Sequence, residues 1–235
     1  MDEQKLSIPM IIVLGLSPGL FMLLLIFIFS SPIFGINFSL YLSAITSIIL
    51  GLIPIELGIL KCIARKENKT IKDLILYTSK TPVKKFILSA IIPFVIAVIA
   101  FVFIEPYEIK LWEKIDLPYL FKLEDTNFME ISYLKITVVL SLLFNGFLGP
   151  IVEELYFRGY LLPRMGVFGK FAPLINTIIF SVYHFFTPRQ NITRILAITP
   201  MVYSVWMNKD IKISIVVHCL LNVSGSLGLL MLLFE

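Results

Sequence analysis

The chain has 235 residues, of which 58% are hydrophobic and only 15% charged, and its formal net charge is +4 at pH 7. Soluble domains carry about a quarter charged residues and less than half apolar ones. The composition therefore excludes a water-soluble globular domain, because there is too little polar sequence to cover the apolar surface. The basic residues lie between the apolar segments, so their charge indicates membrane topology and not a nucleic-acid partner.

The apolar residues are collected in long runs, each near or beyond the roughly 20 residues that cross a bilayer as a helix. Backbone amides in lipid must be satisfied internally, so such runs have to be helical. We predict an all-α, polytopic transmembrane bundle, a single membrane domain over residues 1–235 with a polar cavity and about seven membrane helices. The expected helices cover residues 8–34, 37–63, 86–104, 132–157, 168–187, 192–207 and 211–234.

Three local features refine this pattern. The first run is much longer than a signal-peptide core, so we expect a retained anchor helix, with a kink at Pro18-Gly19. The sixth run is short and interrupted by Pro200, which leaves a partly re-entrant segment as an alternative. Cys62 and Cys219 fall at or inside apolar segments, so neither a disulfide framework nor a zinc-thiolate site is expected.

The charges of the connections predict the orientation of the chain. Basic connections stay in the cytoplasm. The connection after the second helix is basic and the next one, residues 105–131, is mostly acidic, so we predict a multi-pass protein of the cell membrane with a cytoplasmic N-terminus. Arg189 and Arg194, which would lie outside, are a small exception. The basic residues of the cytoplasmic connection are Lys61, Arg65, Lys66, Lys69, Lys72, Lys80, Lys84 and Lys85, against Glu67 and Asp73.

Ionisable residues inside the predicted helices are concentrated in the C-terminal half. A charge within a bilayer costs on the order of 2.5–3.5 kcal/mol, so such residues persist only where they are paired or face a cavity. The first three helices contain one acidic residue deep in an apolar run, Glu56. This asymmetry predicts one polar site, built from Glu153, Glu154, Arg158, His184, His218 and Asn222, a set that includes both histidines of the chain.

The first polar motif follows Gly149-Pro150, a step that can bend a helix. Glu154 and Arg158 are four residues apart, so they share a helix face with the acid in the favourable N-terminal position and are expected to pair. Glu153 points about 100° away from Glu154 and has no local cation, which makes it a candidate general base. The alternative is a helix end whose charges simply reach the cytoplasmic interface.

Two further motifs repeat the four-residue spacing. Phe180 and His184 share one face of the fifth predicted helix, and His218 and Asn222 share one face of the last. An imidazole and a carboxamide one turn apart present donors toward one point and are suited to hold a developing oxyanion. Each motif alone is also compatible with a polar contact between packed helices.

Two hydrolytic mechanisms fit these residues. In the first, Glu153 and His184 hold and activate a water, while His218 and Asn222 stabilise the oxyanion, and no cofactor is required. In the second, Glu153, His184 and His218 ligate a zinc ion that activates the water. We favour the first.

Other hydrolytic classes have weaker support. The sequence contains no His-Glu-x-x-His motif and no pair of acids with the spacing of an aspartyl intramembrane protease. A serine nucleophile at Ser181 or Ser224 would lack the glycine-flanked context that exposes one. A transporter would place charges in both halves of the chain, and here they are one-sided.

The three motifs together resemble those of the CPBP family, the CAAX-protease and bacteriocin-processing membrane proteins also called Abi. Glu153-Glu154-Leu-Tyr-Phe-Arg158 resembles its EExxxR signature, Phe180-Ser-Val-Tyr-His184 its FxxxH motif, and His218-Cys-Leu-Leu-Asn222 its HxxxN motif. The resemblance covers about residues 130–234, which would form the protease core. The order and spacing of three motifs make it far more specific than any one of them.

The resemblance implies an intramembrane endopeptidase similar to the type II CAAX prenyl endopeptidases, which remove a C-terminal tripeptide from isoprenylated proteins. It implies Glu153 as the water-activating residue with His184, and His218 with Asn222 as the oxyanion site. Glu154 and Arg158 would support them, together with Phe180. The implied partners are membrane lipid and a membrane-anchored or prenylated substrate. The family is often labelled metalloprotease, and some members act in bacteriocin immunity, so zinc dependence and a non-catalytic role remain the alternatives.

Overall fold

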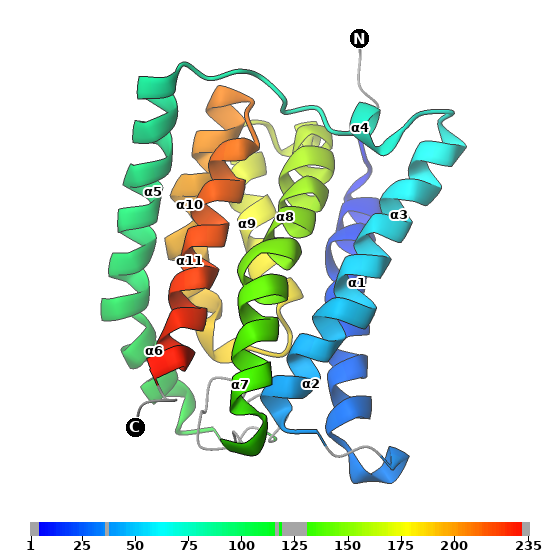
Figure 1. The fold of residues 1–235 in the computed structure, drawn as a ribbon. Helices are drawn as coiled ribbons and strands as arrows, with labels where there is room; N and C mark the ends of the chain where they lie inside the picture. The colour runs from blue at the N-terminus through cyan, green and yellow to red at the C-terminus, as the bar shows by residue number, and fades with distance from the viewer. Residues whose placement is uncertain (1–4, 36–37, 116–117, 119–130, 232–235) are drawn as a thin grey trace.

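The protein is an all-α helical bundle throughout the residues that the structure describes, which are 5–35, 38–115, 118 and 131–231 (Figure 1). In this computed structural model, the described residues form one isolated β-bridge, between Thr78 and Asp210. In chain order the elements are α1 (Ile8–Ser30), η1 (Pro32–Phe34), α2 (Leu40–Ser47), η2 (Ile48–Leu52), α3 (Ile53–Lys66), α4 (Ile71–Leu74), α5 (Val83–Phe103), α6 (Glu105–Trp112), α7 (Ile131–Leu140), η5 (Ser141–Leu148), α8 (Gly149–Glu154), η6 (Leu155–Leu161), η7 (Leu162–Arg164), η8 (Gly166–Phe171), α9 (Ala172–Tyr183), η9 (Pro188–Gln190), α10 (Asn191–Asn208) and α11 (Lys212–Met231).

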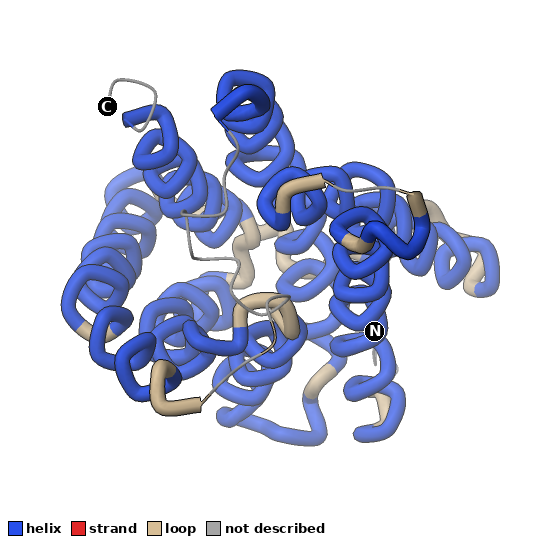
Figure 2. Tube along the Cα trace, turned by 90° about the horizontal axis from the view of Figure 1, so that it is seen from below, coloured by secondary structure: helices blue, strands red, loops and turns tan. Residues whose placement is uncertain are grey.

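Five helical stretches within the described ranges are long and apolar enough to cross a membrane. Seen from below, the helices lie side by side (Figure 2). Their outer faces are apolar: on α5, Leu88 is 58% exposed and Phe103 is 65% exposed. Such surface is stable against lipid and not against water, so this is the pattern of a multi-pass membrane protein. The stretches are Ile8–Ser30, Leu40–Lys66, Val83–Trp112, Lys135–Arg164 and Gly166–Tyr183.

The last two predicted membrane helices are present as helices but do not reach the apolar length of the other five. The sixth corresponds to α10, which continues through Pro200 as an unbroken helix and packs along α5, α9 and α11. Its buried polar residues, including Thr193 and Arg194, are covered by protein and not by lipid. The seventh corresponds to α11, whose apolar part is the shorter stretch Lys212–Gly228. Of the roughly seven membrane spans expected, five are therefore shown among the described residues.

Segments with π-helical hydrogen bonding adjoin the helix parts that carry the predicted acids. One, η2, directly precedes the start of α3, and two others, η5 and η6, flank the short α8 on both sides. A π-helical turn inserts a residue and rotates the faces that follow, and it is frequent at functional sites. Gly149 permits this geometry at the start of α8, since a Cβ there would lie 2.8 Å from the carbonyl oxygen of Phe144.

The first helix approaches α9 closely at Gly19. Pro18 and Gly19 are both buried, and α1 continues through them from Ile8 to Ser30. A Cβ at Gly19 would collide with the carbonyl oxygen of Tyr183, so only glycine allows this contact. The contact fixes the backbone one residue before His184.

We expect Gly19→Ala to destabilise the protein by about 1–3 kcal/mol, the usual cost of overpacking a tight contact. The matched control is Gly58→Ala on α3, where no atom lies within 4 Å of the added methyl group. This control should be neutral or stabilising, because alanine favours helix more than glycine does. Thermal unfolding of both variants in detergent measures the difference. Equal stabilities would contradict the close approach of α1 to α9.

Candidate active site

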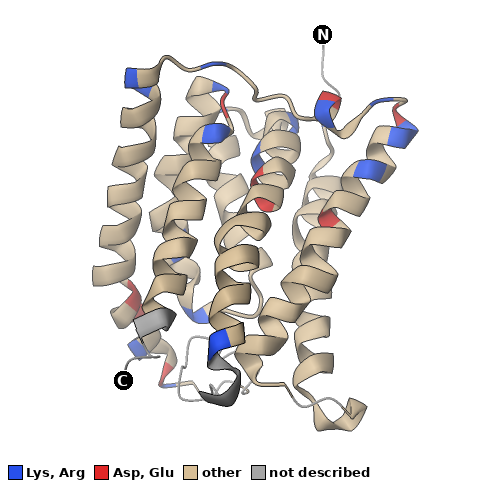
Figure 3. Ribbon diagram, viewed as in Figure 1, with Lys and Arg blue, Asp and Glu red and all other residues tan. Residues whose placement is uncertain are grey.

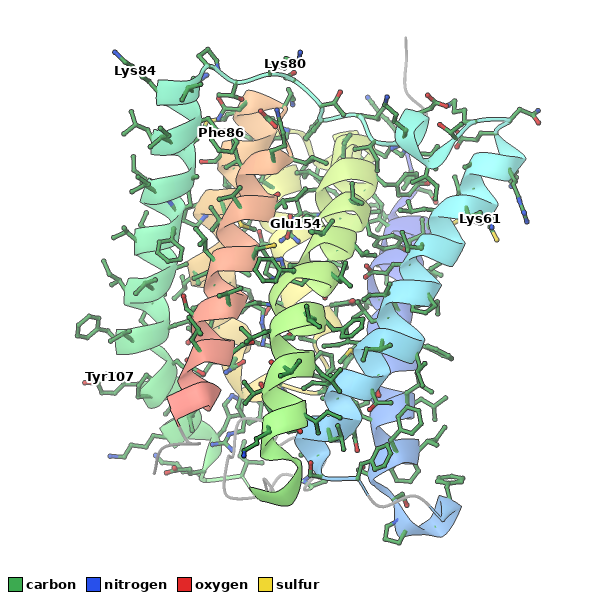
Figure 4. The ribbon with its side chains drawn as sticks, viewed as in Figure 1. Lys61, Lys80, Lys84, Phe86, Tyr107 and Glu154 are labelled. Atoms are coloured by element: carbon green, nitrogen blue, oxygen red, sulfur yellow. The ribbon has the colours of Figure 1, made fainter. Side chains whose placement is uncertain are left out.

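A buried chain of hydrogen bonds joins Arg158, Glu154 and His218. The Nη1 atom of Arg158 donates to Oε1 of Glu154 at 3.0 Å, and Nδ1 of His218 lies 2.9 Å from the same oxygen. The side chains of Arg158 and Glu154 are fully buried, and that of His218 is 7% exposed. Figure 4 shows Glu154 in the interior of the bundle. The ion pair expected from the spacing is present, and it also holds an imidazole from α11.

These contacts determine which nitrogen of His218 carries a proton. Glu154 accepts from the Arg158 guanidinium, so it is an ionised acceptor, and the Nδ1 atom of His218 must be the donor. In the neutral imidazole, a proton on Nδ1 leaves the lone pair on Nε2. That Nε2 atom lies 3.7 Å from Oε2 of Glu153.

His184 has the same tautomer for a different reason. It follows the last residue of α9 with non-helical backbone angles, and its Nδ1 atom lies 2.8 Å from the carbonyl oxygen of Phe180. A carbonyl can only accept, so Nδ1 donates and Nε2 again carries the lone pair. This Nε2 atom lies 3.9 Å from Oε1 of Glu153. The two histidines therefore present equivalent nitrogens to the two oxygens of one carboxylate.

The ring of Phe180 lies among the polar groups. The guanidinium carbon of Arg158 is 4.1 Å from the ring centroid, within the range of a cation–π interaction. The rings of His184 and His218 meet the same ring edge-on, with centroids at 4.7 and 5.8 Å. Phe180 thus packs against three of the residues that the sequence groups with it.

Asn222 lies one helical turn beyond His218 on α11. Its Nδ2 atom donates to the backbone carbonyl of Asn145 at 2.9 Å. Asn145 belongs to the π-helical segment η5. A carboxamide has two N–H groups, so one remains for another acceptor. Asn222 lines the same cavity as Glu153 and His184, so all four predicted catalytic residues meet in one region.

Two cavities adjoin this cluster. The smaller, about 100 Å³, is lined by Glu153, His184 and Asn222 together with apolar residues of α1 and α2. The larger, about 600 Å³, is lined by His184, His218 and Asn222 and runs between α5, α10 and α11 as far as Glu105. The cluster is therefore accessible to small molecules although its side chains are largely buried.

Two residues that sequence reasoning did not assign to the site complete it. The hydroxyl of Tyr183 lies 2.8 Å from Oε1 of Glu56 and 3.3 Å from Oε1 of Glu153. The sequence contains a feature that could have pointed to each of these two residues. Glu56 is an acid in an otherwise apolar run, and Tyr183 follows Phe180 by three residues on the same helix face.

The two serines considered as nucleophiles donate to backbone carbonyls. The hydroxyl of Ser181 donates to the backbone carbonyl of Asn191, and that of Ser224 donates to the carbonyl of Leu220. Neither is hydrogen-bonded to a histidine. In the part of the chain that the structure describes, no group of three His, Cys, Asp or Glu side chains is arranged to hold a metal ion.

The fold and this cluster define a multi-pass membrane protein with a buried acid–imidazole site. Residues 135–224 match the family model described as type II CAAX prenyl endopeptidase Rce1-like, and this part of the chain is a domain of that family. The resemblance drawn from three motifs, expected over about residues 130–234, is thus confirmed over residues 135–224. No curated protein and no solved structure matches the chain.

We expect Glu154→Leu or Arg158→Met to destabilise the protein by about 3–5 kcal/mol, because each leaves an unpaired buried charge. The double variant should regain much of that stability while losing any activity that needs His218. Thermal unfolding of the three variants in detergent measures the coupling. The control is Lys69→Met, which breaks an exposed pair with Glu67 and should change stability little. Additive losses in the double variant would contradict a mutually dependent pair.

Proposed function

We propose that this protein is an intramembrane endopeptidase that hydrolyses a peptide bond with a water activated by Glu153 and His184. The observation that carries the proposal is the convergence of two histidine Nε2 lone pairs on the Glu153 carboxylate beside a cavity. The endopeptidase description of the matching family supports the same reaction class.

The separations around Glu153 suit a bridging water. At 3.7 and 3.9 Å, the distances from Glu153 to His218 and His184 exceed a direct hydrogen bond, and a water molecule can bridge Glu153 and His184. Glu153 would accept a proton from this water while His184 accepts its second hydrogen bond. The water oxygen then attacks the carbonyl carbon. The C–N bond breaks as Glu153 returns the proton to the leaving amine.

The carbonyl oxygen becomes negative during attack and needs donors. Asn222 supplies the N–H that does not bond to Asn145. His218 supplies Nε2–H only in its doubly protonated form, because its neutral form carries the proton on Nδ1. Glu154, which accepts from Nδ1, and Glu153, whose Oε2 atom lies 3.7 Å from Nε2, would both stabilise that imidazolium. Preorganised donors of this kind typically contribute 10²–10³-fold, roughly, to the rate.

We propose a membrane-anchored protein or peptide as the substrate, with a prenyl chain as the anchor that the family description names. Val98, Phe101 and Ile198 give the larger cavity an apolar wall, and that cavity begins at the two histidines. Such a wall suits an apolar chain held next to a scissile bond, because an apolar chain there leaves no buried polar group without a partner.

We expect Glu153→Gln to lower the cleavage rate of a prenylated reporter peptide in reconstituted vesicles by about 10²–10⁴-fold, the contribution of a general base. The glutamine keeps the volume of the side chain and removes the base. Glu67→Gln, an exposed acid far from the cluster, is the control and should cleave normally. Full turnover by the Glu153 variant would end the proposal.

The same assay separates the mechanism from its metal-dependent alternative. Extended treatment with a strong zinc chelator should leave the wild-type rate unchanged, because the proposed steps use only side chains and water. Loss of activity that is restored by added zinc would contradict this mechanism. Comparison of prenylated with unprenylated peptides in the same vesicles tests the proposed anchor.

We further propose that the lysine-rich end of the bundle faces the cytoplasm. Lys61, Lys80 and Lys84 lie at this end (Figure 4), and Lys and Arg residues gather where α3 ends and α5 begins (Figure 3). Basic segments beside membrane helices are retained in the cytoplasm. In this orientation the larger cavity extends from the histidines toward the opposite membrane face. A substrate would then reach the site from the outer leaflet.

Single cysteines test this orientation in a background where Cys62 and Cys219 are replaced by alanine. We expect a membrane-impermeant maleimide to label Lys110→Cys in intact cells and to label Lys84→Cys only after permeabilisation. Both positions are exposed and lie at opposite ends of the helical stretch that contains α5 and α6. The reverse labelling pattern would contradict the proposed orientation.

A further inference from the structure

A hydroxyl group links the acid at the centre of the site to a second buried acid on another helix. Glu56 lies on α3, outside the segment that matches the family model, and its side chain is fully buried. Its Oε1 atom is 2.8 Å from the hydroxyl of Tyr183, which is itself 3.3 Å from Oε1 of Glu153. One phenol therefore bridges two carboxyl groups that the proposed mechanism treats differently.

The number of protons in this bridge follows from its contacts. A phenol has a single proton and can donate it to one carboxyl group only. The other carboxyl contact is favourable only if that carboxyl group donates a proton to the phenol oxygen. The three side chains therefore need two protons, one phenolic and one carboxylic, to make both hydrogen bonds.

The surroundings indicate which acid carries the carboxylic proton. Glu153 faces the two histidines and a cavity. By contrast, Oε2 of Glu56 is buried and has no hydrogen-bond partner among the described residues. Leaving an ionised oxygen unpaired in the interior is costly, so the neutral acid is favoured at Glu56. The nearby cation, Arg158, is already paired with Glu154.

We infer that Glu56, as a neutral carboxylic acid, acts with Tyr183 to position the Glu153 carboxylate. Glu56 donates to the oxygen of Tyr183, and the Tyr183 hydroxyl donates to Oε1 of Glu153. This directed chain fixes the carboxylate opposite the two imidazoles and leaves it ionised, as a base requires. The assignment of Glu56 and Tyr183 as positioning residues rests on the proposed catalytic role of Glu153.

The neighbouring packing supports such a positioning role. Tyr183 directly precedes His184, so one turn at the end of α9 places two of the side chains that face Glu153. Gly19 lets α1 approach the backbone of Tyr183, and the ring of Tyr183 stacks on Phe180 with centroids at 5.9 Å. The phenol is thus held from several sides, and its hydroxyl has little freedom to choose other partners.

Three variants test the chain kinetically in the vesicle assay. Glu56→Gln can still donate an N–H to Tyr183 and should keep kcat within a few-fold of wild type. Glu56→Leu and Tyr183→Phe remove a link and should lower kcat by about 10-fold or more with little change in KM, because orientation is lost and binding is not. Wild-type kcat in Glu56→Leu would overturn the inference. A Glu56→Gln enzyme as slow as Glu56→Leu would contradict the assignment of Glu56 as a neutral hydrogen-bond donor.

An infrared measurement tests the proton without any substrate. We expect the carbonyl-stretch band of a buried, protonated carboxylic acid in the wild-type spectrum, retained in Glu153→Gln and lost in Glu56→Gln. A band absent from wild type, or unchanged in Glu56→Gln, would overturn the assignment. Because this readout needs no turnover, it separates failure of this inference from failure of the proposed peptidase activity. The infrared measurement also tests the protonation state of Glu56 if Glu56→Leu does not fold.

Discussion

Pairing of the Glu154 carboxylate with the Arg158 guanidinium is the interaction on which the rest of the site depends. Either charge alone would be expensive in the interior of a membrane protein, and both side chains are fully buried. Together they are neutral, and the Phe180 ring covers the guanidinium. The paired Glu154 carboxylate accepts a hydrogen bond from Nδ1 of His218 on α11. The proton of the imidazole therefore lies on Nδ1, and Nε2 faces Glu153.

The site can be understood as two acids with opposite surroundings on adjacent positions of one helix. Glu154 accepts hydrogen bonds from Arg158 and His218. Glu153 faces the Nε2 lone pair of His184 and the hydroxyl of Tyr183. A carboxylate in the second setting is free to exchange a proton with a water, whereas one in the first setting is not. Adjacent positions of a helix point about 100° apart, so the two acids of α8 face different neighbours.

Much of the site could be predicted from sequence because its motifs obey helical spacing. The Glu154–Arg158 pair follows from a four-residue interval, and the meeting of His184 and His218 follows from the scarcity of polar residues in apolar runs. The contact of Asn222 with Asn145 could not be predicted, since it depends on a π-helical register. The bridge through Tyr183 depends on α3 and α9 packing together around α8, which no local pattern specifies. Of the seven expected spans, five are shown among the described residues. The sixth, α10, carries polar residues that neighbouring helices cover, and the seventh, α11, has the shorter apolar stretch Lys212–Gly228.

The proposed mechanism requires that acid and imidazole groups from separate helices share one water within the bilayer. An experimental structure in lipid nanodiscs, at a resolution that shows ordered water, can test this arrangement. We expect a water within hydrogen-bond distance of both the Glu153 carboxylate and Nε2 of His184. A structure in which these side chains point toward lipid or toward different compartments, with Glu153 paired to Arg158, would contradict it.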